Sequence, residues 1–192
     1  KLMEISDEMC KRLLHHEGLY YPLGLGPHGL VSEALLLHMK SPAIHGALNM
    51  IYRYGITEDE TYAQKVYPYL RGVADFWEKD LVCRDGVYHV VGDGMHERTD
   101  GNIRDNGVPE DPVNTLGYLK TFFTWMPRIS EALDLDEKKR EKWLEIAENL
   151  APYPKGTIRE IQENPTLWKE VDVKLEDLLP EEMLDKEIYY DE

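Results

Sequence analysis

Residues 42–82 read PAIHGALNMIYRYGITEDETYAQKVYPYLRGVADFWEKDLV, and this stretch decides the fold class. Ser41 followed by Pro42 is typical of a helix start, because serine can accept a bond from a free backbone amide and proline has no amide to leave unpaired. The pattern then favours a helix as far as Gly55, since glycine readily takes the left-handed conformation that ends helices. The first part of the stretch therefore predicts one well-bounded helix.

The second part of the same stretch predicts further helix. Thr57 to Glu60 has the spacing of a capping box, in which the threonine accepts from the backbone three residues on and the glutamate reaches back. We expect a short helix from about residue 59 to 66, and Pro68 then restarts the pattern in a helix that runs to about Val82. Its apolar stripe identifies the side chains expected to face a core: Leu70, Val73, Phe76, Trp77 and Leu81.

Helical patterns also flank this stretch. Residues 2–15 form an amphipathic pattern, and Asp111–Pro112 repeats the cap-plus-proline signal for a helix with a kink near Pro127. Asp136 is expected to cap a further helix that runs to about Asn149. Beyond residue 151 the pattern weakens to one possible short strand at residues 157–161 and an acidic end.

These elements predict an all-α fold of antiparallel helical hairpins, with long polar loops and little strand. The sequence has no fixed repeat period, so a ring of unequal hairpins is favoured over an armadillo-like or tetratricopeptide-like array. We expect residues 1–151 to form the helical-hairpin domain, as part of a larger barrel, and residues 152–192 to form an acidic connector or tail.

Composition limits the partners of the chain. Its 192 residues are 42% hydrophobic, which is enough for one domain with a real core. The formal net charge of −15 opposes binding to nucleic acid and to anionic membrane surfaces, and no basic patch offsets it. Cys10 and Cys83 lack CxxC spacing and are expected to be buried free thiols. The helical pattern begins directly at Lys1, so we expect the chain to be part of a larger polypeptide, and its compartment is not indicated.

The most polar segment runs from His89 to Phe123 and reads HVVGDGMHERTDGNIRDNGVPEDPVNTLGYLKTFF. A long polar loop between helices is where a helical protein usually keeps its chemistry. Its carboxylates can transfer protons and its amides and arginines can hold hydroxyl groups, while Trp77, Tyr88 and Trp125 offer faces for stacking. These are the ingredients of a sugar-binding cleft.

Three segments between about residues 42 and 151 resemble the six-hairpin (α/α)6-barrel glycoside hydrolases, especially the α-L-fucosidase-like glycoside hydrolase family 95. The YPYLRGVADFW wording at residues 67–77 is the most specific part of the resemblance. VVGDGMHERTDGN occupies the place of the loop that holds the family's acid, and DPVNTLGYLKTFF occupies the place of the next helix. The resemblance implies a partial (α/α)6 toroid.

The resemblance also implies that Glu97 lies where the family's general acid lies. A carboxyl group in a partly desolvated cleft has its pKa raised toward working pH, as protonation of a glycosidic oxygen requires. Glu97 could equally brace the loop by pairing with Arg98 or Arg104. Asp100 is the candidate second carboxylate, beside Asp105 and Asp111, and all three have alternative roles as turn or cap residues.

Further side chains of the segment are candidates for holding a sugar. They have donors, acceptors or apolar faces suited to hydroxyl groups and pyranose rings: Tyr88, His89, His96, Arg98, Asn102, Arg104 and Asn114. Trp77 lies on the apolar stripe, so a core position is favoured for it. Three imidazoles, His45, His89 and His96, raise the question of a metal, but no HxH or HxxxH spacing supports one, and we expect neither metal nor cofactor.

These observations lead to a functional hypothesis. The chain is expected to be part of a carbohydrate-active enzyme that hydrolyses a terminal deoxy or neutral sugar with inversion, with Glu97 as proton donor and a carbohydrate as its substrate. The alternative is a non-catalytic helical carbohydrate-binding or scaffold module. A phosphorylase of similar barrel shape, which would require inorganic phosphate, is a third possibility.

Overall fold

The computed structural model describes residues 2–21, 39–93, 110–163 and 177–189. Five long helices account for most of these residues: α1 Leu2–Leu14, α2 Pro42–Thr57, α3 Glu60–Asp80, α4 Val113–Ala132 and α5 Glu137–Glu148. Two short strands, β1 Val82–Arg84 and β2 Val87–His89, form an antiparallel hairpin after α3. The sequence predicted an all-α fold with little strand. The residues that the structure describes are mostly helical, with two small antiparallel strand pairs, so the prediction is confirmed at this coarser level.

Helices α2 and α3 form the first hairpin, but its turn differs from the prediction. Helix α2 continues through Gly55 to Thr57 and ends at Glu58, whose backbone takes the left-handed conformation. The cap of α3 is Asp59, whose side chain accepts a bond from the Tyr62 amide. Gly55 instead allows close packing, because a Cβ atom there would lie 2.8 Å from Cη2 of Trp125. The predicted Gly55 terminator and Thr57 capping box are therefore wrong.

Helix α3 is continuous where the sequence predicted two helices. Pro68 lies inside it and removes one backbone hydrogen bond. The helix survives because its apolar face is packed on both sides of the proline, with Tyr67 and Leu70 buried directly beside it. All five side chains of the predicted stripe are buried, so the orientation of α3 was predicted correctly.

Helices α4 and α5 form the second hairpin. Its turn contains Asp134 and Asp136, both with positive φ. Asp136 stands at the start of α5 as predicted, but its side chain makes no capping bond. Its carboxylate instead accepts from Tyr67 Oη at 2.9 Å and from Arg71 Nε at 3.0 Å, which ties the second hairpin to α3.

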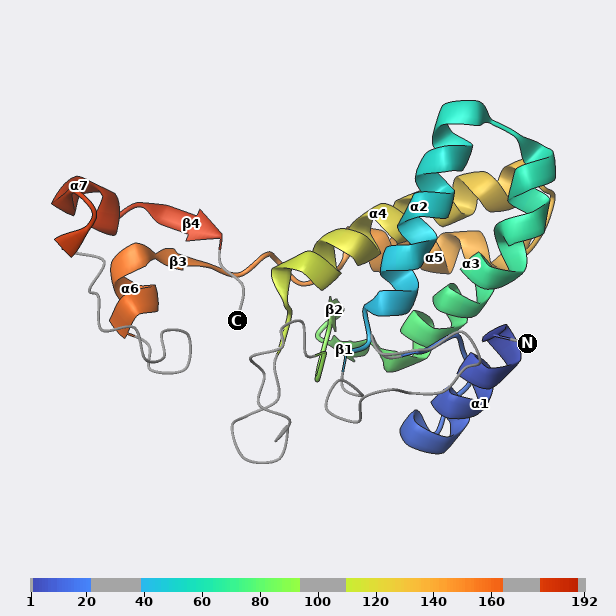
Figure 1. Cartoon of the computed structure of the whole chain (residues 1–192), viewed down its shortest axis with the longest axis horizontal. Helices are drawn as coiled ribbons and strands as arrows, with labels where there is room; N and C mark the ends of the chain where they lie inside the picture. Colours follow the sequence, from blue (N-terminus) through green and yellow to red (C-terminus); the bar gives the residue numbers. More distant parts are fainter. Residues whose placement is uncertain (1, 22–38, 94–109, 164–176, 190–192) are drawn as a thin grey trace.

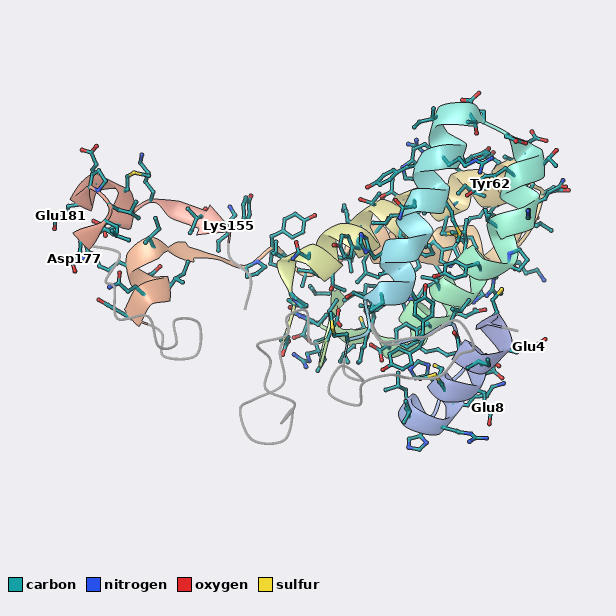
Figure 2. All side chains as sticks on the ribbon, viewed as in Figure 1. Glu4, Glu8, Tyr62, Lys155, Asp177 and Glu181 are labelled. Carbon is teal, nitrogen blue, oxygen red and sulfur yellow. The ribbon has the colours of Figure 1, made fainter. Side chains whose placement is uncertain are left out.

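The two hairpins pack against each other around an aromatic core (Figure 1). Side chains fill the space between α2, α3, α4 and α5 (Figure 2). Trp77, Trp143, Phe76, Phe122 and Phe123 are fully buried there. The Trp143 indole donates to Glu78 Oε1 at 2.7 Å, so the largest core residue of α5 is also bonded to α3.

Helix α1 docks on this core through the segment that follows it. Leu19 and Tyr20 are buried, the Tyr20 ring stacks on Phe76, and the Leu19 amide donates to the Gly72 carbonyl at 2.8 Å. Gly18 lies so close to Phe76 that a Cβ atom would stand 2.4 Å from the Phe76 Cα. This contact explains why a glycine with φ +135° is needed there.

The C-terminal part holds more regular structure than the predicted tail. Strand β3 covers Lys155–Thr157 and pairs antiparallel with β4, Glu187–Tyr189, and two short helices lie between them, α6 Ile158–Glu163 and α7 Glu181–Leu184. The strand expected at residues 157–161 is thus shifted toward the N-terminus, and most of that range is helical. These elements extend beyond the hairpins in Figure 1.

The five long helices form two hairpins plus α1, and no ring of hairpins is found among the described residues. Cys10 is buried as expected, whereas Cys83 lies on β1 and is exposed, so the prediction of two buried thiols is wrong for Cys83. Among the described helices, none combines the length and apolar character needed to cross a membrane.

Candidate functional site

The polar segment begins at the end of β2 and enters α4 at Val113, and the residues just after β2 lie beside those just before α4. We call these residues, 89–93 and 110–111, the loop neck. Val91 and Glu110 form an antiparallel bridge across it. The Asp111 amide donates to the Val90 carbonyl at 2.8 Å, and the Val90 amide donates to Asp111 Oδ1 at 2.8 Å. Both ends of the segment are therefore fixed at one end of the paired hairpins.

The central residues of the predicted site lie outside the described residues, which stop at Asp93 and resume at Glu110. This group holds both catalytic candidates and four of the sugar-binding candidates: Glu97, Asp100, His96, Arg98, Asn102 and Arg104. The described members of the predicted site are Tyr88, His89 and Asn114.

His89 lies at the neck beside two carboxylates. Its Nδ1 atom is 2.7 Å from Asp111 Oδ2 and 3.5 Å from Glu110 Oε1. Arg84 on β1 also pairs with Glu110. The three side chains His89, Glu110 and Asp111 are partly exposed, so the group is open to solvent.

Asp111 does not cap α4, which corrects its predicted role. Its backbone has φ 57°, and the N-cap position of α4 is occupied by Pro112 instead. The left-handed turn directs the carboxylate back toward β2, where it bonds the Val90 amide and His89. A cap would have been a local bond, whereas Asp111 joins segments that are 21 residues apart.

Tyr88 occupies a core position that leaves little surface for a sugar. It is only 6% exposed, and its hydroxyl donates to Glu145 on α5. The Lys142 ammonium lies 4.7 Å from the centre of its ring. Burial raises the pKa of the Tyr88 hydroxyl. The side chain therefore ties β2 to α5, and its predicted stacking role is not supported by this geometry.

Asn114 lies exposed in the first turn of α4, next to the neck. Trp77 is fully buried, as the apolar stripe predicted, and so offers no face to a ligand. Trp125 packs beside Gly55 with the Arg128 guanidinium 5.2 Å from its ring centre, which gives it a packing role between α4 and α2.

Behind the neck lies a buried polar group that the sequence did not reveal. We call Lys40, Asp80, Asp93 and Thr115 the buried polar cluster. Asp93 is fully buried, and its two oxygens accept from the Lys40 amide at 2.7 Å and the Thr115 hydroxyl at 2.7 Å. Lys40 Nζ donates to both Asp80 oxygens, at 3.0 and 2.8 Å, and to the Val91 carbonyl at 2.9 Å.

Burial raises the pKa of Asp93, and the bonds from the Thr115 hydroxyl and from the Lys40 and Ser41 amides oppose this shift. Four separate segments meet in the cluster: the chain before α2, the end of α3, the neck and the start of α4. Residues so far apart in sequence leave no spacing that sequence reasoning could detect. The cluster fixes the first end of the polar segment to the starts of both α2 and α4.

A cysteine, a histidine and an aspartate also line up near the end of α1. Cys10 Sγ is 3.5 Å from His16 Nδ1, and His16 Nε2 is 3.5 Å from Asp80 Oδ1, an ion-pair separation without hydrogen-bond geometry. Nucleophilic catalysis requires an accessible thiolate. Cys10 is fully buried, and burial raises its pKa to about 11, so this arrangement is structural.

Comparison with known proteins adds no identification. A scan against protein-family models gave no match, and a search of curated protein sequences also gave none.

Proposed function

We propose that this chain contributes the acid-bearing loop of a carbohydrate-active enzyme that hydrolyses glycosidic bonds with inversion, similar to the α-L-fucosidase-like glycosidases of family 95. The observation that supports the proposal most is the position of the loop neck. The polar segment is anchored at the end of two packed helical hairpins, beside the starts of α2 and α4. Loops held in this way by a rigid scaffold are common sites of catalytic residues.

In this proposal the loop supplies the reacting groups. Glu97 donates the proton to the glycosidic oxygen, and Asp100 is the second carboxylate, which activates water. An inverting mechanism places two such carboxyl groups about 6.5–9.5 Å apart. Asp93 is unsuited to either role, because it is fully buried and its oxygens are bonded to the Lys40 amide and Thr115.

The remaining candidates hold the sugar. His96, Arg98, Asn102 and Arg104 supply donors and acceptors for hydroxyl groups, and Asn114 adds an amide at the first turn of α4. His89 lies at the edge of this set, with one ring nitrogen already bonded to Asp111.

The test is turnover of a panel of aryl glycosides, with the α-L-fucoside first, by the polypeptide in which this chain occurs. Glu97→Gln keeps the shape of the side chain and removes its acid, so kcat should fall by at least about 100-fold, the usual size of a general-acid contribution. Asp100→Asn should lower kcat similarly if it activates water. Asp85→Asn, in the turn between β1 and β2, is the matched control and should leave turnover unchanged. Unaltered kcat in the Glu97→Gln variant would exclude the mechanism.

The second candidate is a helical carbohydrate-binding or scaffold module without catalysis. The burial of Tyr88 favours the scaffold role within this alternative, since a ring predicted to face a sugar bonds to Glu145 on α5 instead. A thermal-shift screen with monosaccharides separates the two candidates, because a ligand that binds only the folded state raises the melting temperature. Stabilisation by a sugar with no turnover of any glycoside selects the binding module.

A further inference from the structure

We propose that His89, Glu110 and Asp111 bind one divalent transition-metal ion, with Zn²⁺ as the preferred ion, at the neck of the polar segment. The side chains come from β2 and from the two residues before Pro112. One ligand atom of each lies within 4.8 Å of the others. This inference concerns metal binding alone and does not depend on the proposed glycosidase activity.

The distances fit a tetrahedral ion. Nitrogen and oxygen ligands stand about 2.0–2.1 Å from Zn²⁺, so two of them in a tetrahedral site are about 3.3 Å apart. His89 Nδ1 lies 2.7 Å from Asp111 Oδ2 and 3.5 Å from Glu110 Oε1, which brackets that value. The two pairs that include His89 therefore need shifts of only about 0.2–0.6 Å to reach the tetrahedral spacing. The ligand atoms of Glu110 and Asp111 lie within 4.8 Å of each other, and rotation of the partly exposed Glu110 side chain would bring them closer.

The backbone already directs two of the ligands. The Val90 amide holds Asp111 Oδ1 at 2.8 Å, which leaves Oδ2 turned toward His89. The bridge between Val91 and Glu110 fixes the positions of the adjoining residues on the two segments. A ligating carboxylate that is itself hydrogen-bonded is typical of metal sites, because the outer bond orients the ligand.

The chemistry of the three ligands selects the class of ion. An imidazole nitrogen favours Zn²⁺, Fe²⁺ and similar ions, whereas Mg²⁺ and Ca²⁺ prefer sites made of oxygen alone. Three protein ligands leave the fourth position of a tetrahedral ion to water. The side chains of His89 and Glu110 are 21% and 40% exposed, so solvent reaches the group.

Arg84 is a residue whose removal should raise the metal affinity, whereas removal of a ligand should lower it. Its guanidinium pairs with Glu110, and a cation bound to Glu110 would compete with this pairing. Removal of the guanidinium should therefore strengthen metal binding if Glu110 is a ligand. The chain thus offers variants that change the affinity in both directions.

The experiment is isothermal titration of the metal-stripped chain with ZnCl₂, and separately with MnCl₂, MgCl₂ and CaCl₂. We expect about one tight equivalent of Zn²⁺, with weaker binding of Mg²⁺ and Ca²⁺. His89→Ala and the isosteric Glu110→Gln should each weaken Zn²⁺ binding by at least about tenfold, since even outer-shell partners contribute that much. Arg84→Ala should tighten it.

Matched controls remove the same chemical groups elsewhere. His45→Ala deletes an exposed imidazole on α2, and Asp85→Asn deletes a carboxylate in the β1–β2 turn, and neither should change the titration. The proposal is overturned if Zn²⁺ does not bind, if His89→Ala binds it as tightly as the unmodified chain, or if Mg²⁺ or Ca²⁺ binds more tightly than Zn²⁺. Circular dichroism of Glu110→Gln checks that lost binding does not reflect lost folding.

Discussion

Replacement of Asp93 by alanine should destabilise the protein more than any change at the exposed neck residues. The Asp93 carboxylate is fully buried and accepts from the Lys40 amide and the Thr115 hydroxyl, each at 2.7 Å. A buried donor left without its acceptor costs about 1–3 kcal/mol. The Ser41 amide also bonds this carboxylate, so three donors lose their acceptor. With some relief because the Thr115 hydroxyl can rotate, the loss in the free energy of unfolding should be about 3 kcal/mol.

The assay is thermal unfolding followed by circular dichroism at pH 7. For a chain of this length 1 kcal/mol corresponds to about 2–4 °C, so the Asp93→Ala variant should melt about 6–12 °C below the unmodified protein. Asp85→Asn removes a carboxylate at an exposed turn and should shift the melting temperature by less than about 2 °C. A shift for Asp93→Ala as small as that of the control would refute the reasoning that the cluster holds the neck.

Three further predictions concern titration, thiol reactivity and packing. Burial raises the pKa of Asp93 in the folded state, so the folded protein keeps a proton that the unfolded chain loses, and stability falls as pH rises above about 4. Asp93→Asn should lack this pH dependence. In urea titrations from pH 4 to 7, the stability of the variant relative to that of the unmodified protein should therefore rise with pH, and a fall would contradict the sign. With a thiol reagent at pH 8, exposed Cys83 should react at once and buried Cys10, whose pKa is raised to about 11, only on unfolding; two fast equivalents would contradict the docking of α1. Gly18→Ala should lower the free energy of unfolding by at least about 2 kcal/mol, because its Cβ would clash with Phe76 and its φ is positive. Gly86→Ala also has positive φ but open space around it, so it should lower the free energy of unfolding by only about 1 kcal/mol. Equal losses for the two variants in urea unfolding would show that packing is not the cause.

The sequence predicted the helices well because an apolar stripe is a local signal. The stripe of α3 depends only on side chains spaced along one helix face, and every member predicted to be inward is buried. The same reasoning placed Trp77 in the core. The element type and its buried side could therefore be known before the partner helices were known.

Helix ends were predicted less well, because tertiary contacts overrode the local signals. Gly55 has the conformational freedom to end α2, but Trp125 packs against it, and the helix continues for two more residues. Pro68 should interrupt α3, yet the buried residues on either side keep the helix intact. Only the tertiary packing partners of α2 and α3 explain these outcomes, and the local sequence does not contain them.

The β1–β2 hairpin, which the sequence analysis did not predict, did have a local sequence signal. Asp85–Gly86 between two short β-prone runs is a strong mark of a two-residue hairpin turn, and both residues have positive φ as such a turn requires. The strands β1 and β2 have only three residues each, so the pattern around the turn was too short to outweigh the helical reading of their neighbours.

The candidate site could be predicted only in part, for a different physical reason. The residue types of the polar segment were known directly from the sequence. The sequence placed the segment between two helices, whereas the structure has it leave the strand β2 and meet a helix only at α4. The bonding partners at the neck could not be predicted, because His89 and Asp111 are 22 positions apart in the sequence and Lys40 and Asp93 are 53 apart. A search for metal ligands by HxH spacing could not find a group that exists only after β2 and the start of α4 are brought together.

Two independent sets of bonds hold the same neck, and they differ in how they respond to solvent. The contacts of Asp93 are buried and depend on the packing of α2 and α4, whereas those of Asp111 and His89 are partly exposed and open to a metal ion. The fold holds the two ends of the segment together, so the conformational entropy lost on closing this loop is lost when the protein folds. A metal ion at His89 would add to these bonds from the solvent side, so the neck would be held both by buried hydrogen bonds and by a dissolved ion.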